Sequence, residues 1–147
     1  MGLLRKWESF QSAGPTVRNL FYRAWLLSGI VRFTLRFLPF SRVLAWKGTM
    51  GVESPSNPHP ESEAYRGALK RALALCDRYT PWGTECYTRA ITGKILLNRV
   101  GLPATVYVGF AKGPDGGYEA HAWLRSYDSC LSGAEQMDLF TVHSFYT

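Results

Sequence analysis

The chain has 147 residues, of which 46% are hydrophobic, and it carries a formal net charge of +6 at pH 7. This length and composition predict one domain with a real core and exclude a repeat array or a low-complexity chain. The basic excess comes without an aromatic RNA-binding motif, so we expect no nucleic-acid partner. The positive charge is explained either by an ordinary basic surface or by binding of an acidic peptide or protein partner.

The three cysteines are an odd number and lack the paired close spacing of a zinc site. The sequence shows no secretion signal with a cleavage site. We therefore expect free thiols, a cytoplasmic location, and no metal or other cofactor. The run over 20–40 is strongly apolar, but Arg23, Arg32 and Arg36 interrupt it. A helix with these charges is not expected to span a membrane.

A helix is predicted from about Thr16 to Leu38, and a shorter one over 42–47 after Pro39. The long helix is apolar nearly all round, so it either packs onto its own domain or docks a partner protein or a membrane face. The following segment has the composition of a linker, with several prolines and serines. We therefore divide the chain into an N-terminal helical region (1–50), a linker (51–60) and a core domain (61–147).

Residues 61–79 form the clearest predicted helix. Apolar side chains recur at three- and four-residue steps, and Arg66, Lys70 and other basic residues occupy the remaining positions. Cys76 lies on the apolar stripe, which predicts a buried structural thiol.

A fourth helix is predicted to begin near Thr84 and to run to about Val100. Pro81 and Gly83 are turn residues, and Thr84 is a suitable N-cap. Cys86 would then be the second helical residue, where free N–H groups and the helix dipole favour a thiolate.

The rest of the chain predicts a small antiparallel sheet with tight turns at 113–117 and 128–129. The predicted strands span 104–111, 118–127, 130–133 and 140–146. With the helices before it, this sheet predicts an α+β fold.

Cys86 is a candidate nucleophile and His121, in the second strand, is its candidate base. A cysteine that opens a helix and a later histidine on a strand are arranged as in papain-like and transglutaminase-like sites. The backbone N–H of Cys86 is a natural oxyanion donor, and the Trp82 indole is a weaker candidate that is better explained by packing. Glu85 would oppose a thiolate unless it points to solvent.

A third group should orient the imidazole. If the last turn is centred between Asp128 and Ser129, His121 lies opposite residue 135 or 136. That selects Glu135, provided that the third strand extends so far. Asp138 is the second choice and Asp128 the third. A metal held by Cys130 and His143 together with Cys86 and His121 fits no trusted zinc spacing.

Several short motifs occur in an order that is typical of one family. They are Leu38-Pro39-Phe40-Ser41-Arg42, Pro81-Trp82-Gly83-Thr84-Glu85-Cys86, Gly101-Leu102-Pro103-Ala104-Thr105, Val108-Gly109 and Ala120-His121-Ala122-Trp123. Together they resemble the lasso-peptide leader peptidases, which are transglutaminase-like cysteine proteases of ribosomal peptide biosynthesis. The resemblance covers about residues 35–147. It implies a transglutaminase-like (papain-like) core, with N-terminal helices packed on a small antiparallel sheet.

The resemblance also implies an activity. Such enzymes cut the leader from a precursor peptide, commonly after a threonine, with Cys86 matching the nucleophile and His121 the base. It implies a separate leader-recognition protein as a partner, which the apolar N-terminal helices could dock, and an ATP-dependent macrolactam cyclase as a further one. The family's aspartate, about a dozen residues after the histidine, falls near Gly133, so Glu135 would have to replace it or the site would act as a dyad.

Two other hypotheses remain at this point. One is a non-catalytic peptide-binding or scaffold protein on a degenerate transglutaminase-like fold, which the missing aspartate and Glu85 support. The other is a different acyl transfer at the same Cys86–His121 pair, such as transglutamination or peptide ligation.

Overall fold

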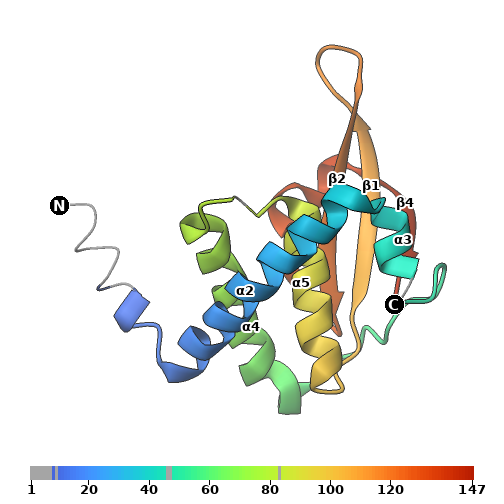
Figure 1. Cartoon of the computed structure of the whole chain (residues 1–147). Helices are drawn as coiled ribbons and strands as arrows, with labels where there is room; N and C mark the ends of the chain where they lie inside the picture. The colour runs from blue at the N-terminus through green and yellow to red at the C-terminus, as the bar shows by residue number, and fades with distance from the viewer. Residues whose placement is uncertain (1–7, 9, 46–47, 83) are drawn as a thin grey trace.

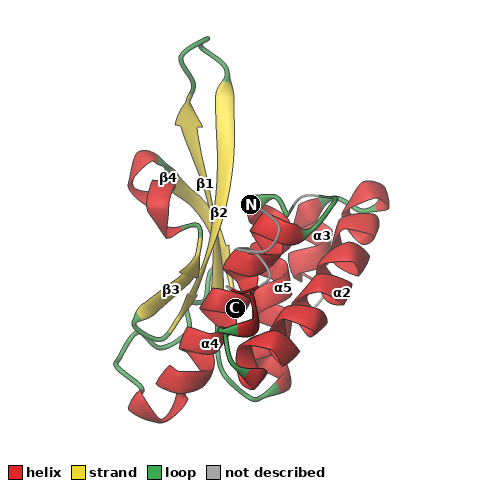
Figure 2. Cartoon of the chain, turned by 90° about the vertical axis from the view of Figure 1, so that its left-hand side faces the viewer, coloured by secondary structure: helices red, strands yellow, loops and turns green. Residues whose placement is uncertain are grey.

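The computed structural model describes the chain except for residues 1–7, 9, 46–47 and 83. Helices cover one face of a four-stranded antiparallel sheet, and a short 3-10 helix lies on the other side (Figure 2). This architecture confirms the predicted α+β class. In chain order the elements are α2 (Pro15–Phe37), α3 (Phe40–Ala45), α4 (Pro60–Tyr79), α5 (Cys86–Arg99), β1 (Thr105–Lys112), β2 (Tyr118–Ser126), β3 (Ser129–Ser132), η1 (Ala134–Leu139) and β4 (Thr141–Tyr146).

The long N-terminal helix α2 belongs to the same hydrophobic core as the rest of the chain. Its inner face, including Leu20, Ala24 and Val31, is buried in the cluster that also contains residues of α4, α5 and the sheet. One core therefore runs across the expected boundary at residues 51–60. The short helix α3 lies two residues earlier than predicted, and Lys47, its predicted end, lies outside the described residues.

The segment before α4 has linker composition but is bonded to the sheet. The Ser54 N–H donates to the Thr105 hydroxyl at 2.8 Å, and Arg125 donates to the carbonyls of Ser54 and Pro55 at 2.9 and 3.1 Å. This segment therefore covers part of the sheet face that the helices leave open.

The sheet has the strand order β3-β2-β1-β4. The β1–β2 hairpin projects well beyond the body of the molecule (Figure 1). β3 spans Ser129–Ser132, and its turn is formed by Tyr127 and Asp128, one residue earlier than predicted. The predicted final strand is confirmed as β4, and it pairs with β1.

Over the residues that the structure describes, no helix is both long enough and apolar enough to span a membrane.

Candidate active site

Cys86 is the first residue of α5 and is partly buried. The N-cap of this helix is Glu85, so the prediction that Thr84 caps it was wrong by one residue. The buried Thr84 hydroxyl instead donates to Asp77 of α4 at 3.3 Å, because a carboxylate competes well for a hydroxyl proton. Gly83, the predicted turn residue, lies outside the described residues. The thiol still lies in the first turn, where the helix dipole favours a thiolate.

The carboxylate of Glu85 lies on the solvent side of the helix start. Its side chain is 70% exposed, and it forms an ion pair with Arg32 of α2 at 3.6 Å. An exposed and paired carboxylate opposes a neighbouring thiolate only weakly.

Trp82 packs against α2. Its ring lies 4.7 Å from that of Trp25, and its indole N–H donates to the Ser28 hydroxyl at 3.4 Å. This agrees with the predicted packing role. Because the indole N–H is bound to Ser28, it is not directed at an oxyanion.

His121 is buried in β2, where it pairs with Gly109 of β1. Its ring stacks on Trp123 at 5.9 Å and lies 5.0 Å from the ring of Phe140. A side chain at Gly109 would lie 2.9 Å from Phe140 Cβ and 3.0 Å from Trp123, so glycine allows this aromatic packing. The imidazole is therefore held between two aromatic rings.

The Nε2 atom of His121 lies 2.9 Å from the main-chain carbonyl oxygen of Gly133. A carbonyl oxygen only accepts hydrogen bonds, so Nε2 must carry the proton. In the neutral ring the lone pair is then on Nδ1, which is the nitrogen that can accept a proton. The main chain thus fixes the tautomer that a general base requires.

Gly133 is required at this position by both its conformation and its surroundings. Its φ is +78°, and a Cβ there would meet Ala122 O at 2.6 Å and Trp123 Cβ at 2.8 Å. It follows His121 by twelve residues, which is where the family resemblance expects an aspartate. Sequence analysis missed this carbonyl, because main-chain acceptors leave no signal in side-chain identity.

The predicted acid Glu135 is exposed in the first turn of η1. The register between β2 and β3 shifts at a bulge, so that Leu124 pairs with Ser132, the last residue of β3. The strand therefore ends before it reaches the position opposite His121. Asp138 is exposed as well. Among the described residues, no hydrogen bond joins either carboxylate to His121. The assignment of Glu135 as the acid therefore stays a prediction.

Asp128, the third candidate, is bound to Arg66 of α4. The two side chains form an ion pair at 3.0 Å, and the hydrogen bond from Arg66 lowers the pKa of Asp128. Arg66 is buried, although its position in the helical pattern predicted an exposed side chain. It also donates to the Ser126 and His59 carbonyls, which offset its desolvation.

The N-terminus of α5 and His121 lie at the same level of the molecule. Gly93 of α5 contacts Leu124 of β2. Cys86 precedes Gly93 by roughly 10 Å along the helix, and His121 precedes Leu124 by roughly the same distance along the strand. Both elements run in the same direction (Figure 1). Leu124 faces α5, whereas His121 and Trp123 face the other side of β2.

The edge of β2 at His121 carries no neighbouring strand in the described part of the chain, because β3 pairs only from Leu124 to Ser126. In the same part, no hydrogen bond joins the Cys86 sulfur to the His121 ring. The pairing of the two residues stays a prediction.

The other two cysteines lie in different surroundings. Cys76 is buried, as predicted, and burial raises its pKa to about 12. Burial also raises the pKa of Cys130, whose thiol lies 3.4 Å from the Ser132 carbonyl. His143 contacts Phe110. Over the described residues, no group of three or more His, Cys, Asp or Glu side chains is placed to hold a metal ion.

Comparison with known proteins gives one match. No curated protein and no solved structure matches the chain significantly. The family model described as "Transglutaminase-like superfamily" matches residues 31–144, which include α3, α4, α5 and almost the whole sheet. The match thus covers both Cys86 and His121, and this chain belongs to the transglutaminase-like superfamily.

Proposed function

We propose that this protein is a cysteine peptidase that removes the leader from a lasso-peptide precursor, with Cys86 as nucleophile and His121 as base. The observation that carries the proposal is the His121–Gly133 hydrogen bond of 2.9 Å. It leaves a basic nitrogen on a buried ring at the level of a helix-opening cysteine. The superfamily match and the ordered motifs support the same chemistry.

In this mechanism Nδ1 of His121 takes the proton of the Cys86 thiol. The thiolate attacks the carbonyl carbon of the scissile amide, and the C–N bond breaks as the imidazolium protonates the leaving amine. Water, deprotonated by the same Nδ1, then hydrolyses the thioester and releases the acid. The Gly133 carbonyl accepts from Nε2–H throughout, which stabilises the imidazolium as the family's carboxylate would, but with a partial charge.

One further feature fits this role. The Cys86 N–H belongs to the first turn of α5, whose N–H groups have no acceptor within the helix, so it can donate to the developing oxyanion. His121 faces away from α5 in this structure, so the first step requires a rearrangement that brings Nδ1 to the sulfur, which we assign to substrate binding.

The proposal includes a separate leader-recognition protein. The outer face of α2 exposes Leu26, Phe33 and Phe37 by 61%, 68% and 71%. Such a contiguous apolar face is typical of a protein-binding surface. The macrolactam cyclase is a second partner in this scheme, and a reducing cytoplasm suits the three free cysteines.

The test is cleavage of the precursor in the presence of the recognition protein, followed by mass spectrometry. Cys86→Ala should abolish cleavage, and Cys130→Ala, which changes a thiol outside the site, should retain it. Unchanged cleavage by Cys86→Ala would end the proposal. The product mass also separates hydrolysis, which adds water to the leader, from transfer to an amine.

A non-catalytic peptide-binding protein is the second candidate. It is favoured by the absence of a Cys86–His121 hydrogen bond among the described residues and by a carbonyl where a carboxylate is expected. Iodoacetamide distinguishes the two candidates. An enzyme should be labelled at Cys86 before Cys76 and Cys130, with a rate that falls in His121→Ala. A scaffold should show no dependence on His121.

A further inference from the structure

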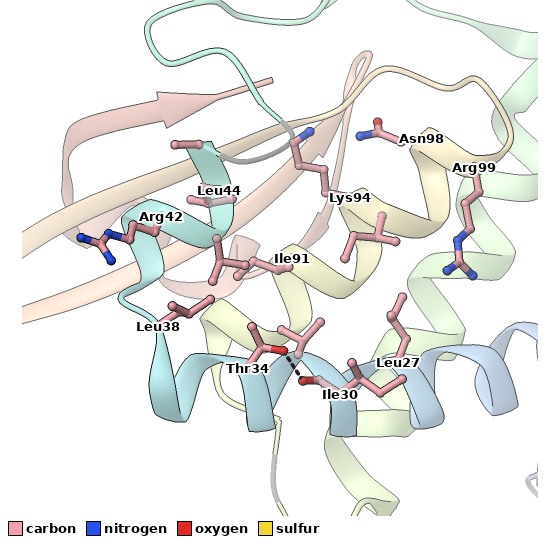
Figure 3. Close-up of a pocket in the computed structure, with 14 residues that line it drawn as sticks. Leu27, Ile30, Thr34, Leu38, Arg42, Leu44, Ile91, Lys94, Asn98 and Arg99 are labelled. Atoms are coloured by element: carbon pink, nitrogen blue, oxygen red, sulfur yellow. Dashed lines mark hydrogen bonds between the residues drawn. The ribbon is translucent and has the colours of Figure 1, made fainter.

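A cavity of about 890 Å³ lies between α2, α3 and α5 (Figure 3), and neither Cys86 nor His121 is among its lining residues. Its volume is within the range of roughly 300–1,000 Å³ that is typical of small-molecule sites. Most of its walls are aliphatic, with Leu27 and Ile30 from α2, Leu44 from α3 and Ile91 from α5. The cavity is therefore shaped to receive an apolar group.

Lys94 of α5 also lines this cavity, and it is only 5% exposed. In the described part of the chain its ammonium has neither an ion pair nor a hydrogen bond. Burial lowers the pKa of Lys94. A buried charge of this kind is costly unless an anion neutralises it.

The charges around the cavity all have the same sign. Arg42 and Arg99 flank it on opposite sides, and Asn98 lies at the same end as Lys94 (Figure 3). Among the described residues that line the cavity there is no Asp or Glu. The cavity therefore combines apolar walls with an uncompensated positive end.

We propose that this cavity binds an alkyl carboxylate, that is, a fatty acid with one unbranched chain. The carboxylate accepts hydrogen bonds from the Lys94 ammonium and from the side-chain amide of Asn98. The alkyl chain lies against Leu27, Ile30 and Ile91. This binding does not depend on the proposed peptidase activity, because none of these residues belongs to the Cys86–His121 site.

An acidic peptide fits the same charge less well. Each peptide residue brings an N–H and a carbonyl that need partners when buried. Thr34 and Asn98 are the neutral polar side chains among the described lining residues, and the Thr34 hydroxyl already donates to the Ile30 carbonyl at 2.9 Å. An alkyl chain has no polar groups to satisfy, so the walls favour it.

The test is isothermal titration calorimetry of the full chain with sodium decanoate, 1-decanol and decyltrimethylammonium. Decanoate should bind with one-to-one stoichiometry and at least about tenfold more tightly than the alcohol, because charge-assisted hydrogen bonds are the stronger ones. Decyltrimethylammonium should not compete with it. Lys94→Met keeps a flexible side chain of nearly the same length and removes the charge, so it should abolish the preference for decanoate over decanol. Lys70→Met, an exposed lysine of α4, should leave the preference intact.

Several outcomes would overturn the proposal. The first is no saturable binding of decanoate at millimolar concentration. The second is a preference for decanoate over decanol in Lys94→Met that equals the preference of the unmodified chain. The third is tighter binding of the capped peptide acetyl-Leu-Leu-Glu-Leu-Leu-amide than of decanoate. If Lys94→Met does not fold, the comparison of the three ligands on the unmodified chain decides the question, since only a cationic site prefers the carboxylate. Cleavage of the precursor is measured separately, so failure here leaves the peptidase proposal untouched.

Discussion

The imidazole of His121 and the main-chain carbonyl of Gly133 are joined by a hydrogen bond of 2.9 Å, although twelve residues separate them. The bond fixes the tautomer of the ring, and the left-handed backbone of Gly133 aims the carbonyl at Nε2. A single glycine thereby takes the position at which the family resemblance expects an acid.

Gly133→Ala should destabilise the fold by roughly 2–4 kcal/mol. A Cβ here combines the cost of a left-handed conformation with overlap against Ala122 and Trp123. Gly101→Ala is the matched control, because its φ is +75° but no atom lies within 4 Å of the added Cβ. It should cost about 1 kcal/mol. Urea denaturation measures both, and equal losses would contradict the overlap.

The thiol of Cys76 should resist iodoacetamide in the folded protein up to about pH 10. Burial raises its pKa to about 12, so the reactive thiolate is scarce, and the buried sulfur is also inaccessible. Labelling should become complete in guanidinium chloride. Mass spectrometry of the alkylated peptides measures this, and fast labelling of the native protein at pH 8 would contradict it.

The same thiol should make the fold sensitive to alkali. The folded-state pKa is raised from 9.0 to about 12, so the folded protein holds this proton more tightly than the unfolded chain does. The contribution of this proton to the free energy of unfolding is fully present below about pH 9 and is lost between pH 9 and 12. Its upper limit is about 4 kcal/mol. Urea denaturation at pH 8 and at pH 10.5 measures this effect. Between these two pH values, Cys76→Ser should lose less stability than the unmodified chain.

Asp128→Asn should lower the midpoint of urea unfolding at pH 7, because Arg66 is buried and would lose its anionic partner. The hydrogen bond from Arg66 lowers the pKa of Asp128 in the folded state. Its contribution is therefore present above the unfolded-state pKa and disappears as the pH falls through the folded value. The unmodified and variant chains should converge in stability in acid, and a constant difference down to pH 2 would exclude the pair as its source.

If the proposed leader-recognition protein docks on α2, replacement of Phe33 and Phe37 by serine should weaken its binding by about tenfold or more, since aromatic side chains dominate such interfaces. Both rings are largely exposed, so the melting temperature should change little. Tyr118, which is 82% exposed at the start of β2, supplies the control Tyr118→Ser. Calorimetry with the purified partner measures the affinities, and equal affinities would place the docking surface elsewhere.

The sequence alone predicted the features that depend on local pattern. Helical periodicity identified α4 and its buried Cys76, alternation and turn residues identified the β1–β2 hairpin, and the turn before Cys86 placed that residue at a helix start to within one position. Each depends on neighbours a few residues away, which is the range over which helix and strand periods act.

Only the tertiary structure decided which distant groups meet. It brought the Gly133 carbonyl to His121, buried Arg66 against the β2–β3 turn, and enclosed Lys94 between three helices. Sequence could not predict these contacts, because they depend on where a bulge ends a strand and on how helices cross. Both follow from packing and main-chain geometry over long separations, and neither is encoded in the identity of the residues that meet.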